Sequence, residues 1–182
     1  MVSLSAGRQQ QTLALSPFVR QVPPTSRLVL RGDPQVLAAA ADALRLPHSE
    51  TPCRAVCNDD FASLWLGPDE RLLMGAVDAA VEMIERLEKA LAGLPHSLVE
   101  TSHAQIAFEV WGPRAADALN IGCPLDFDPA SFPVDMCTRT VFAKAQIVLW
   151  RTAPDIFRVE VARSFAPYVT KVLALAAHEP TP

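Results

Sequence analysis

Hydrophobic and polar positions recur in the same order twice along this chain. In each copy a short apolar run leads to a Gly, to a Pro within two residues, and then to the identical pentapeptide Ala-Ala-Asp-Ala-Leu, at residues 40–44 and 115–119. Each copy is then expected to continue with a strand that contains a Trp, a turn, a second strand and a closing helix. Because an internal repeat constrains a fold more than any single residue does, the pattern predicts one pseudo-symmetric body.

The first copy predicts five elements. A strand at 28–30 leads to a helix, because Asp33 is a good N-cap residue and Pro34 suits the first helical position. Apolar runs on either side of the turn residues Gly67-Pro68-Asp69-Glu70 predict antiparallel strands at 61–66 and 72–74. A helix is expected over 76–94, with an i,i+4 pair of Glu82 and Arg86 and with an apolar stripe of Val77, Val81, Ile84, Leu87 and Leu91.

The second copy repeats this order. Strands are predicted at 98–101, 106–110, 138–150 (bent near Lys144) and 157–161, with a short helix from Pro113, a proline-rich loop at 122–136 and a last helix from Ser164. The fold class is therefore α+β, with duplicated β-α-β-β-α halves and an antiparallel sheet covered by helices.

These elements imply a simple domain organisation. Residues 26–177 form a single pseudo-symmetric domain, with repeat halves at about 26–95 and 98–177. Residues 1–25 have no sustained period and are predicted to be an extended N-terminal arm, which either lacks order or becomes ordered along a partner.

Composition narrows the class of protein. Half of the 182 residues are hydrophobic and a fifth are charged, which is typical of a globular chain. No apolar run reaches the roughly 20 residues of a membrane helix, and the N-terminus has no signal-peptide core, so we expect a cytoplasmic protein without membrane contact. A net charge of −4 and the lack of a Lys/Arg stripe argue against nucleic acid.

Local motifs indicate little chemistry. The chain has no phosphate-binding glycine loop and no nucleophile elbow. Asp59 and Asp60 are adjacent carboxylates beside a strand, where neighbouring side chains point to opposite faces, so a solvated turn is favoured over catalysis. His48, Cys53 and Cys57 lack the usual zinc spacing, and the cysteines are typical of small buried residues in a reducing compartment. No catalytic or metal residue is assigned.

The tryptophans are the side chains to consider for contacts with a partner protein. Trp65 and Trp150 occupy equivalent places in the two copies, which predicts core or sheet-face positions. Trp111 stands just before a Gly-Pro helix start, where the other copy has Arg31. An indole at an exposed strand end would be a possible partner interface, while the alternative is packing under the adjacent helix.

Several stretches resemble the gamma subunits of heterotetrameric sarcosine oxidases. The resemblance covers about residues 20–177 and is carried by residues 27–33, 64–70, 109–116, 123–126, 137–140 and 157–165. It implies a structural or assembly subunit, with no catalytic residue of its own, of a complex that oxidatively demethylates sarcosine to glycine. The products would be hydrogen peroxide and formaldehyde or methylenetetrahydrofolate.

The resemblance also implies partners and cofactors. Alpha, beta and delta subunits would accompany this chain, and FAD, FMN, NAD and tetrahydrofolate would be bound by those partners, with zinc in the delta subunit. Such gamma subunits are similar to the folate-binding domain of aminomethyltransferases. Asp59 and Asp60, followed by Leu66 and Gly67, resemble a stretch in which an acidic residue lies beside folate. A folate-binding aminomethyltransferase-like module therefore stays open as the alternative, as does a free scaffold without a ligand.

Overall fold

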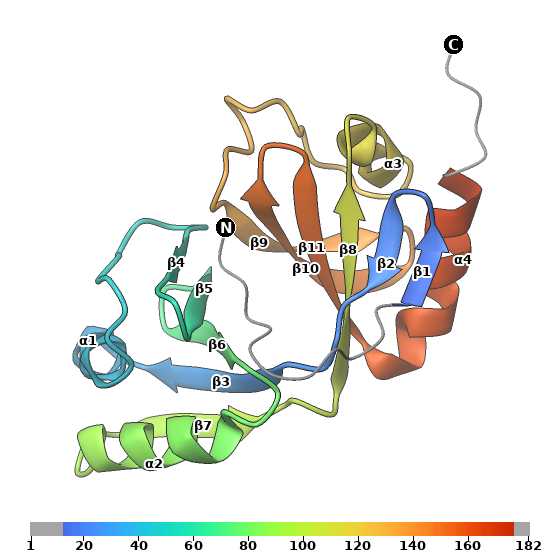
Figure 1. Ribbon diagram of the computed structural model, residues 1–182. Coiled ribbons are helices and arrows are strands. Elements are labelled where there is room, and N and C mark those ends of the chain that lie inside the picture. The colour runs from blue at the N-terminus through green and yellow to red at the C-terminus, as the bar shows by residue number, and fades with distance from the viewer. Residues whose placement is uncertain (1–12, 177–182) are drawn as a thin grey trace. The chain divides into compact units, whose positions relative to one another are not determined.

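The structure is a computed structural model that describes residues 13–176 (Figure 1). The described residues divide into two compact units, residues 24–102 and residues 13–23 with 103–176. The sequence predicts one domain with halves at 26–95 and 98–177. The strand expected at the start of the second half instead belongs to the first unit, so the division falls between Ser102 and His103.

The first unit is a five-stranded antiparallel sheet with two helices. Its strand order is β4-β5-β6-β3-β7. The chain runs as a β-α-β-β-α-β motif of the split ferredoxin-like type, with β4 added at one edge. Its elements are β3 (Ser26–Gly32), α1 (Pro34–Ala43), β4 (Ala55–Cys57), β5 (Ala62–Gly67), β6 (Glu70–Gly75), α2 (Ala80–Ala90) and β7 (His96–Glu100).

The two helices confirm some expectations and correct others. Helix α1 begins at Pro34, and the Asp33 carboxylate accepts the Val36 N–H at 2.9 Å, as predicted. Helix α2 begins only at Ala80, because residues 76–79 form a turn in which the Ala79 N–H is donated to the Ala76 carbonyl.

The predicted apolar stripe of α2 is wrong in part. Val77 and Val81 are 43% and 67% exposed, while Met83, Leu87 and Leu91 are fully buried. Val77 precedes the helix, and Val81 lies on the side opposite the Met83–Leu87–Leu91 row that contacts the core. The Glu82–Arg86 ion pair is confirmed.

The second unit has a six-stranded antiparallel sheet of order β1-β2-β8-β11-β10-β9. Strands β8, β10 and β11 correspond to β3, β5 and β6 of the first unit. The remaining position of the motif, beside the first strand, is filled by β2. The elements are β1 (Leu13–Ser16), β2 (Val19–Gln21), β8 (Gln105–Trp111), α3 (Ala115–Asn120), β9 (Cys137–Phe142), β10 (Ala145–Ala153), β11 (Ile156–Ala162), the 3-10 turn η1 (Arg163–Phe165) and α4 (Ala166–Ala176).

Of the predicted N-terminal arm, residues 1–12 lie outside the described residues, and residues 13–21 differ from the prediction. Residues 13–21 form a hairpin whose second strand pairs with β8, just as β7 pairs with β3 in the first unit. Val19 is buried among core residues, and the Trp111 N–H is donated to the Phe18 carbonyl at 2.9 Å. Without this hairpin, β8 would be an open sheet edge with unpaired backbone groups.

The predicted long strand at 138–150 is instead a hairpin of β9 and β10. Ala143 and Lys144 form its turn, with Phe142 paired to Ala145. Ala143 has a φ of +52°, a left-handed conformation that two-residue turns usually reserve for Gly or Asn, so the sequence lacks the usual turn signal. The loop supports the turn, because the Ala143 N–H is donated to the Gly122 carbonyl at 2.7 Å.

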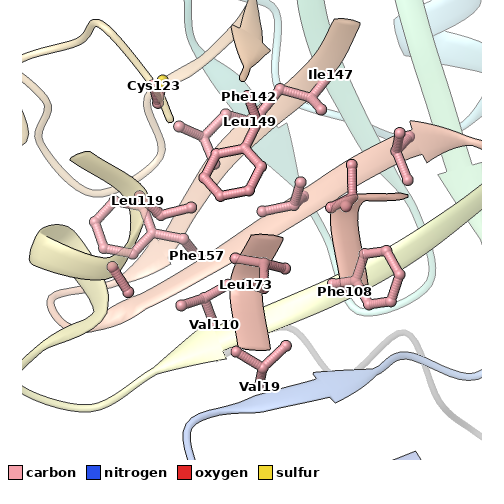
Figure 2. Packing of buried hydrophobic residues seen from close by; sticks show 14 of the residues in the cluster. Val19, Phe108, Val110, Leu119, Cys123, Phe142, Ile147, Leu149, Phe157 and Leu173 are labelled. Atoms are coloured by element: carbon pink, nitrogen blue, oxygen red, sulfur yellow. The ribbon is translucent and has the colours of Figure 1, made fainter. Parts of the chain in front are cut away.

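Each unit has its own apolar core. In the second unit, Phe108, Val110, Leu149, Phe157 and Leu173 converge between the sheet and its helices (Figure 2). The core of the first unit lies between α1, α2 and one sheet face, and it includes Leu28, Leu30, Val36, Phe61, Leu73, Met83 and Leu87. No helix within residues 13–176 is long and apolar enough to cross a membrane.

Candidate functional site

Trp111 lies at the end of β8, opposite Ile156 of β11. The Arg20 guanidinium lies over its indole, 5.1 Å from the ring centroid, and Arg20 also forms an ion pair with Glu109. Trp111 is partly buried, and the residue that covers one face of it comes from the N-terminal hairpin. The sequence alone does not predict this contact, because Arg20 and Trp111 come together only when β2 pairs with β8, and that pairing was not expected.

Charged side chains form a row across the six-stranded sheet of the second unit. Glu109 pairs in register with Arg20 of β2 and with Arg158 of β11. The Arg158 Nε donates to a carboxylate oxygen of Glu160 at 2.6 Å. Side-chain exposure falls along this row from 42% at Arg20 to 1% at Glu160. Along β11, Arg158 and Glu160 alternate with Phe157, Val159 and Val161, yet both faces of the strand are buried.

Asp59 and Asp60 lie in an exposed bend between β4 and β5. Asn58 organises this bend, because its side-chain oxygen accepts the Asp60 and Phe61 N–H groups at 2.9 and 2.7 Å. Its amide nitrogen donates to the Leu44 carbonyl at 2.9 Å, which ties the bend to the end of α1. The sequence singled out the two carboxylates, whereas Asn58 is the residue that shapes the segment.

A cavity of about 340 Å³ lies in the first unit, between α1, the segment 46–54 and the β5–β6 hairpin. Trp65 and Arg71 line one side of it, with the Arg71 guanidinium 5.9 Å from the Trp65 ring centroid. His48 lines the rim and forms a 2.7 Å contact with the Asp42 carboxylate. Asp59 and Asp60 do not line this cavity.

The cysteines differ from the expectation that all four are buried. Cys123 and Cys137 are buried, while Cys53 and Cys57 are partly exposed. Burial raises the pKa of the Cys123 thiol. Among residues 13–176, no group of three His, Cys, Asp or Glu side chains is placed to hold a metal ion.

The loop at 122–136 is ordered by polar contacts. The buried Arg151 side chain donates to the carbonyls of Phe127, Phe132 and Pro154. The Asp126 carboxylate accepts the Asp128 N–H at 2.9 Å and the Ser131 hydroxyl at 2.7 Å. The sequence predicts the loop but neither of these anchors.

Asp126 provides a pH-dependent test of this loop. The Asp128 N–H, and then the Ser131 hydroxyl, hold the pKa of Asp126 below its usual value, so its contribution to stability is present above that value and is lost as pH falls through the lowered pKa. A carbon-detected NMR titration of the Asp126 carboxyl should show the lowered pKa. Ser131→Ala should raise it toward the usual value, and Ser164→Ala, an exposed serine elsewhere, should leave it unchanged. Equal titration in all three proteins would contradict the assigned contacts.

The duplicated motif defines an α+β class shared with known proteins. Aminomethyltransferase T of the glycine cleavage system from Bartonella henselae superposes with a TM-score of 0.64 at 15% identity, over 86% of this chain and 47% of that one. At this identity the likeness shows the fold alone, and it confirms the predicted fold class.

Closer matches define the family. The family model described as "Sarcosine oxidase, gamma subunit family" matches residues 31–179. The sarcosine oxidase gamma subunit of Corynebacterium sp. strain U-96 is 32% identical over 167 residues, which are 88% of this chain and 79% of that protein. A solved structure of the heterotetrameric sarcosine oxidase from the same strain, in complex with pyrrole 2-carboxylate, contains a chain with a TM-score of 0.80 at 27% identity, over 90% of this chain and 87% of that one. This chain therefore belongs to the sarcosine oxidase gamma subunit family.

Proposed function

We propose that this chain is the gamma subunit of a heterotetrameric, cytoplasmic sarcosine oxidase and that it acts as a structural and assembly subunit. The observation that carries this proposal is the match, along nearly the whole chain, to a chain of the heterotetrameric enzyme. Family membership and the named relative support the same assignment.

The proposed assembly has defined partners. Alpha, beta and delta subunits complete it, and FAD, FMN, NAD and tetrahydrofolate are bound by those subunits. The reaction, oxidative demethylation of sarcosine to glycine, takes place on the partners, and this chain contributes no catalytic residue. The two packed cores of this chain favour a structural role, because they hold the surface residues in fixed positions.

Trp111 is the proposed centre of a partner interface. Arg20 covers one side of its indole and β-sheet pairing fixes its backbone, so less conformational entropy is lost when a partner covers it than for a mobile side chain. Large aromatic side chains that are already rigid are typical anchors of protein interfaces.

Affinity purification of the tagged full-length chain from its native cell tests the proposal. Gel filtration with flavin absorbance recorded should show elution with three other polypeptides and with flavin. Trp111→Ala should lower the recovered partner polypeptides about tenfold or more, as expected for an interface anchor. The comparison variant Phe165→Ala, which shortens an exposed aromatic side chain of η1, should have a smaller effect.

One outcome would contradict the assembly role, and another would contradict the role of Trp111. A colourless species without other polypeptides would remove the oxidase-subunit assignment. If that species bound folate saturably, and Asp59→Ala or Asp60→Ala abolished the binding, the aminomethyltransferase-like alternative would be favoured. Equal losses in Trp111→Ala and Phe165→Ala would leave the assembly role in place but would remove Trp111 as the interface centre.

A further inference from the structure

The function proposed above assigns no role to the cavity of the first unit, whose walls are chemically distinct. Its volume of about 340 Å³ lies at the lower end of the range typical of small-molecule sites. One wall is helix α1, and the other is the face of the β5–β6 hairpin that carries Ser63, Trp65 and Arg71. All lining residues belong to the first unit, so the site is built within one compact body.

The alanine-rich sequence of α1 explains why the cavity exists. Pro34, Leu37, Ala38 and Ala41 recur at i, i+3, i+4 and i+7, which places them on one helix face, and all four line the cavity. Ala38 and Ala41 provide only methyl groups where a core helix normally carries larger side chains. The helix is held at its distance from the sheet by the buried residues Val36, Ala40 and Leu44, so the space beside the two alanines stays open.

The polar groups of the cavity favour an anion. Two arginines, Arg54 and Arg71, line it, against Glu50 as the acidic side chain among the lining residues. Arg71 is fixed in place, because its Nη1 donates to the Gly67 and Glu70 carbonyls at 2.7 and 2.9 Å. A guanidinium held in this way is preorganised to bind a carboxylate, for which its planar set of N–H donors is well suited.

The rest of the cavity lining favours a ligand with a flat apolar ring. Trp65 offers a ring beside Arg71. Leu30 and Leu73, which pair with Arg71 and Ser63, supply apolar surface on the same sheet, and Leu46 adds more from the segment 46–54. We propose that this cavity binds a small organic carboxylate with an aromatic ring, whose ring lies between α1 and Trp65 and whose carboxylate faces Arg71 and Arg54. This inference does not depend on the assembly role of the chain.

Isothermal titration calorimetry on the full-length chain, with indole-3-carboxylate as the probe, tests the site. The expected dissociation constant is about 1 mM or lower for a ligand of this size. The neutral indole-3-carboxamide should bind about tenfold more weakly, because it lacks the charge that the arginines attract. Arg71→Gln should remove most of this preference for the carboxylate.

Matched variants locate the binding. Ala38→Leu fills the cavity from α1 and should weaken binding tenfold or more, whereas Ala90→Leu makes the same change at an exposed position of α2 and should leave it unchanged. Thermal unfolding of both variants verifies that each is folded. Absence of binding at about 10 mM probe, equal binding by the carboxamide, or unchanged binding in a folded Ala38→Leu protein would each overturn the proposal.

Discussion

Replacing Val19 by Asp is expected to lower the free energy of unfolding by about 3–5 kcal/mol, because it places an unpaired charge in a core. Val19 is 1% exposed and pairs with Val110 of β8. Its strand comes from a segment that precedes the first unit in sequence, yet it completes the sheet of the second. Urea unfolding of the full-length chain followed by circular dichroism measures the loss.

A matched substitution controls for the chemistry of the change. Val141→Asp makes the same replacement on β9, an edge strand of the same sheet, at a side chain that is 40% exposed. Its expected cost is below about 1 kcal/mol. Hydrogen exchange should show that Val19→Asp reduces the protection of β8 amides more than that of β3 amides. Equal costs for the two variants would contradict the structural role of the hairpin.

Local signals were sufficient for much of the fold. The Asp33–Pro34 start of α1 and the turn that joins β5 to β6 each depend on residues close in sequence, and the structure confirms them. The repeated pentapeptide indicated equivalent positions, and its copies lie at the end of α1, with Leu44 as the C-cap residue, and within α3. Such features follow from backbone preferences and side-chain periodicity, which a single sequence displays directly.

Features that depend on distant residues could not be predicted in this way. The pairing of Val19 with Val110 joins segments far apart in the chain, and β2 is too short for its alternation to identify it. The turn at Ala143 is stabilised by Gly122 rather than by its own sequence. Arg158 and Glu160 alternate with apolar residues along β11, a pattern typical of a half-exposed strand, yet both are buried. A period-two pattern does not distinguish a solvated face from a covered one.

The candidate sites illustrate the same limit. Trp111 was identified from its position before a Gly-Pro pair, but its contact with Arg20 required the unexpected hairpin. The cavity is built from segments between Leu30 and Leu73, and its sequence signal is the recurrence of Ala38 and Ala41 on one helix face. That signal is weak, because alanine is also the residue that forms helices most readily.

Arg151→Met is expected to lower the free energy of unfolding by about 2–4 kcal/mol, because it leaves backbone carbonyls without donors in a buried place. Arg151 is 5% exposed and donates to Phe127, Phe132 and Pro154 at 3.2, 2.5 and 2.9 Å. Methionine retains much of the apolar volume of the side chain. The loss therefore reports mainly on the hydrogen bonds, and urea unfolding of the full-length chain measures it.

Two further variants separate the hydrogen bonds from charge and from packing. Arg151→Lys keeps the charge, but one ammonium cannot reproduce a guanidinium that reaches three carbonyls, so an intermediate loss is expected. Arg139→Met makes the same change at an exposed position of β9 and should cost less than about 0.5 kcal/mol.

Limited proteolysis should cut the segment 122–136 faster in Arg151→Met than in Arg139→Met, because the Arg151 contacts at Phe127 and Phe132 fall within it. If cleavage rates and stabilities matched in these two variants, the edge-to-face contact of Phe127 with Phe132 would be sufficient to order the loop, and Arg151 would be only a buried charge that the fold tolerates.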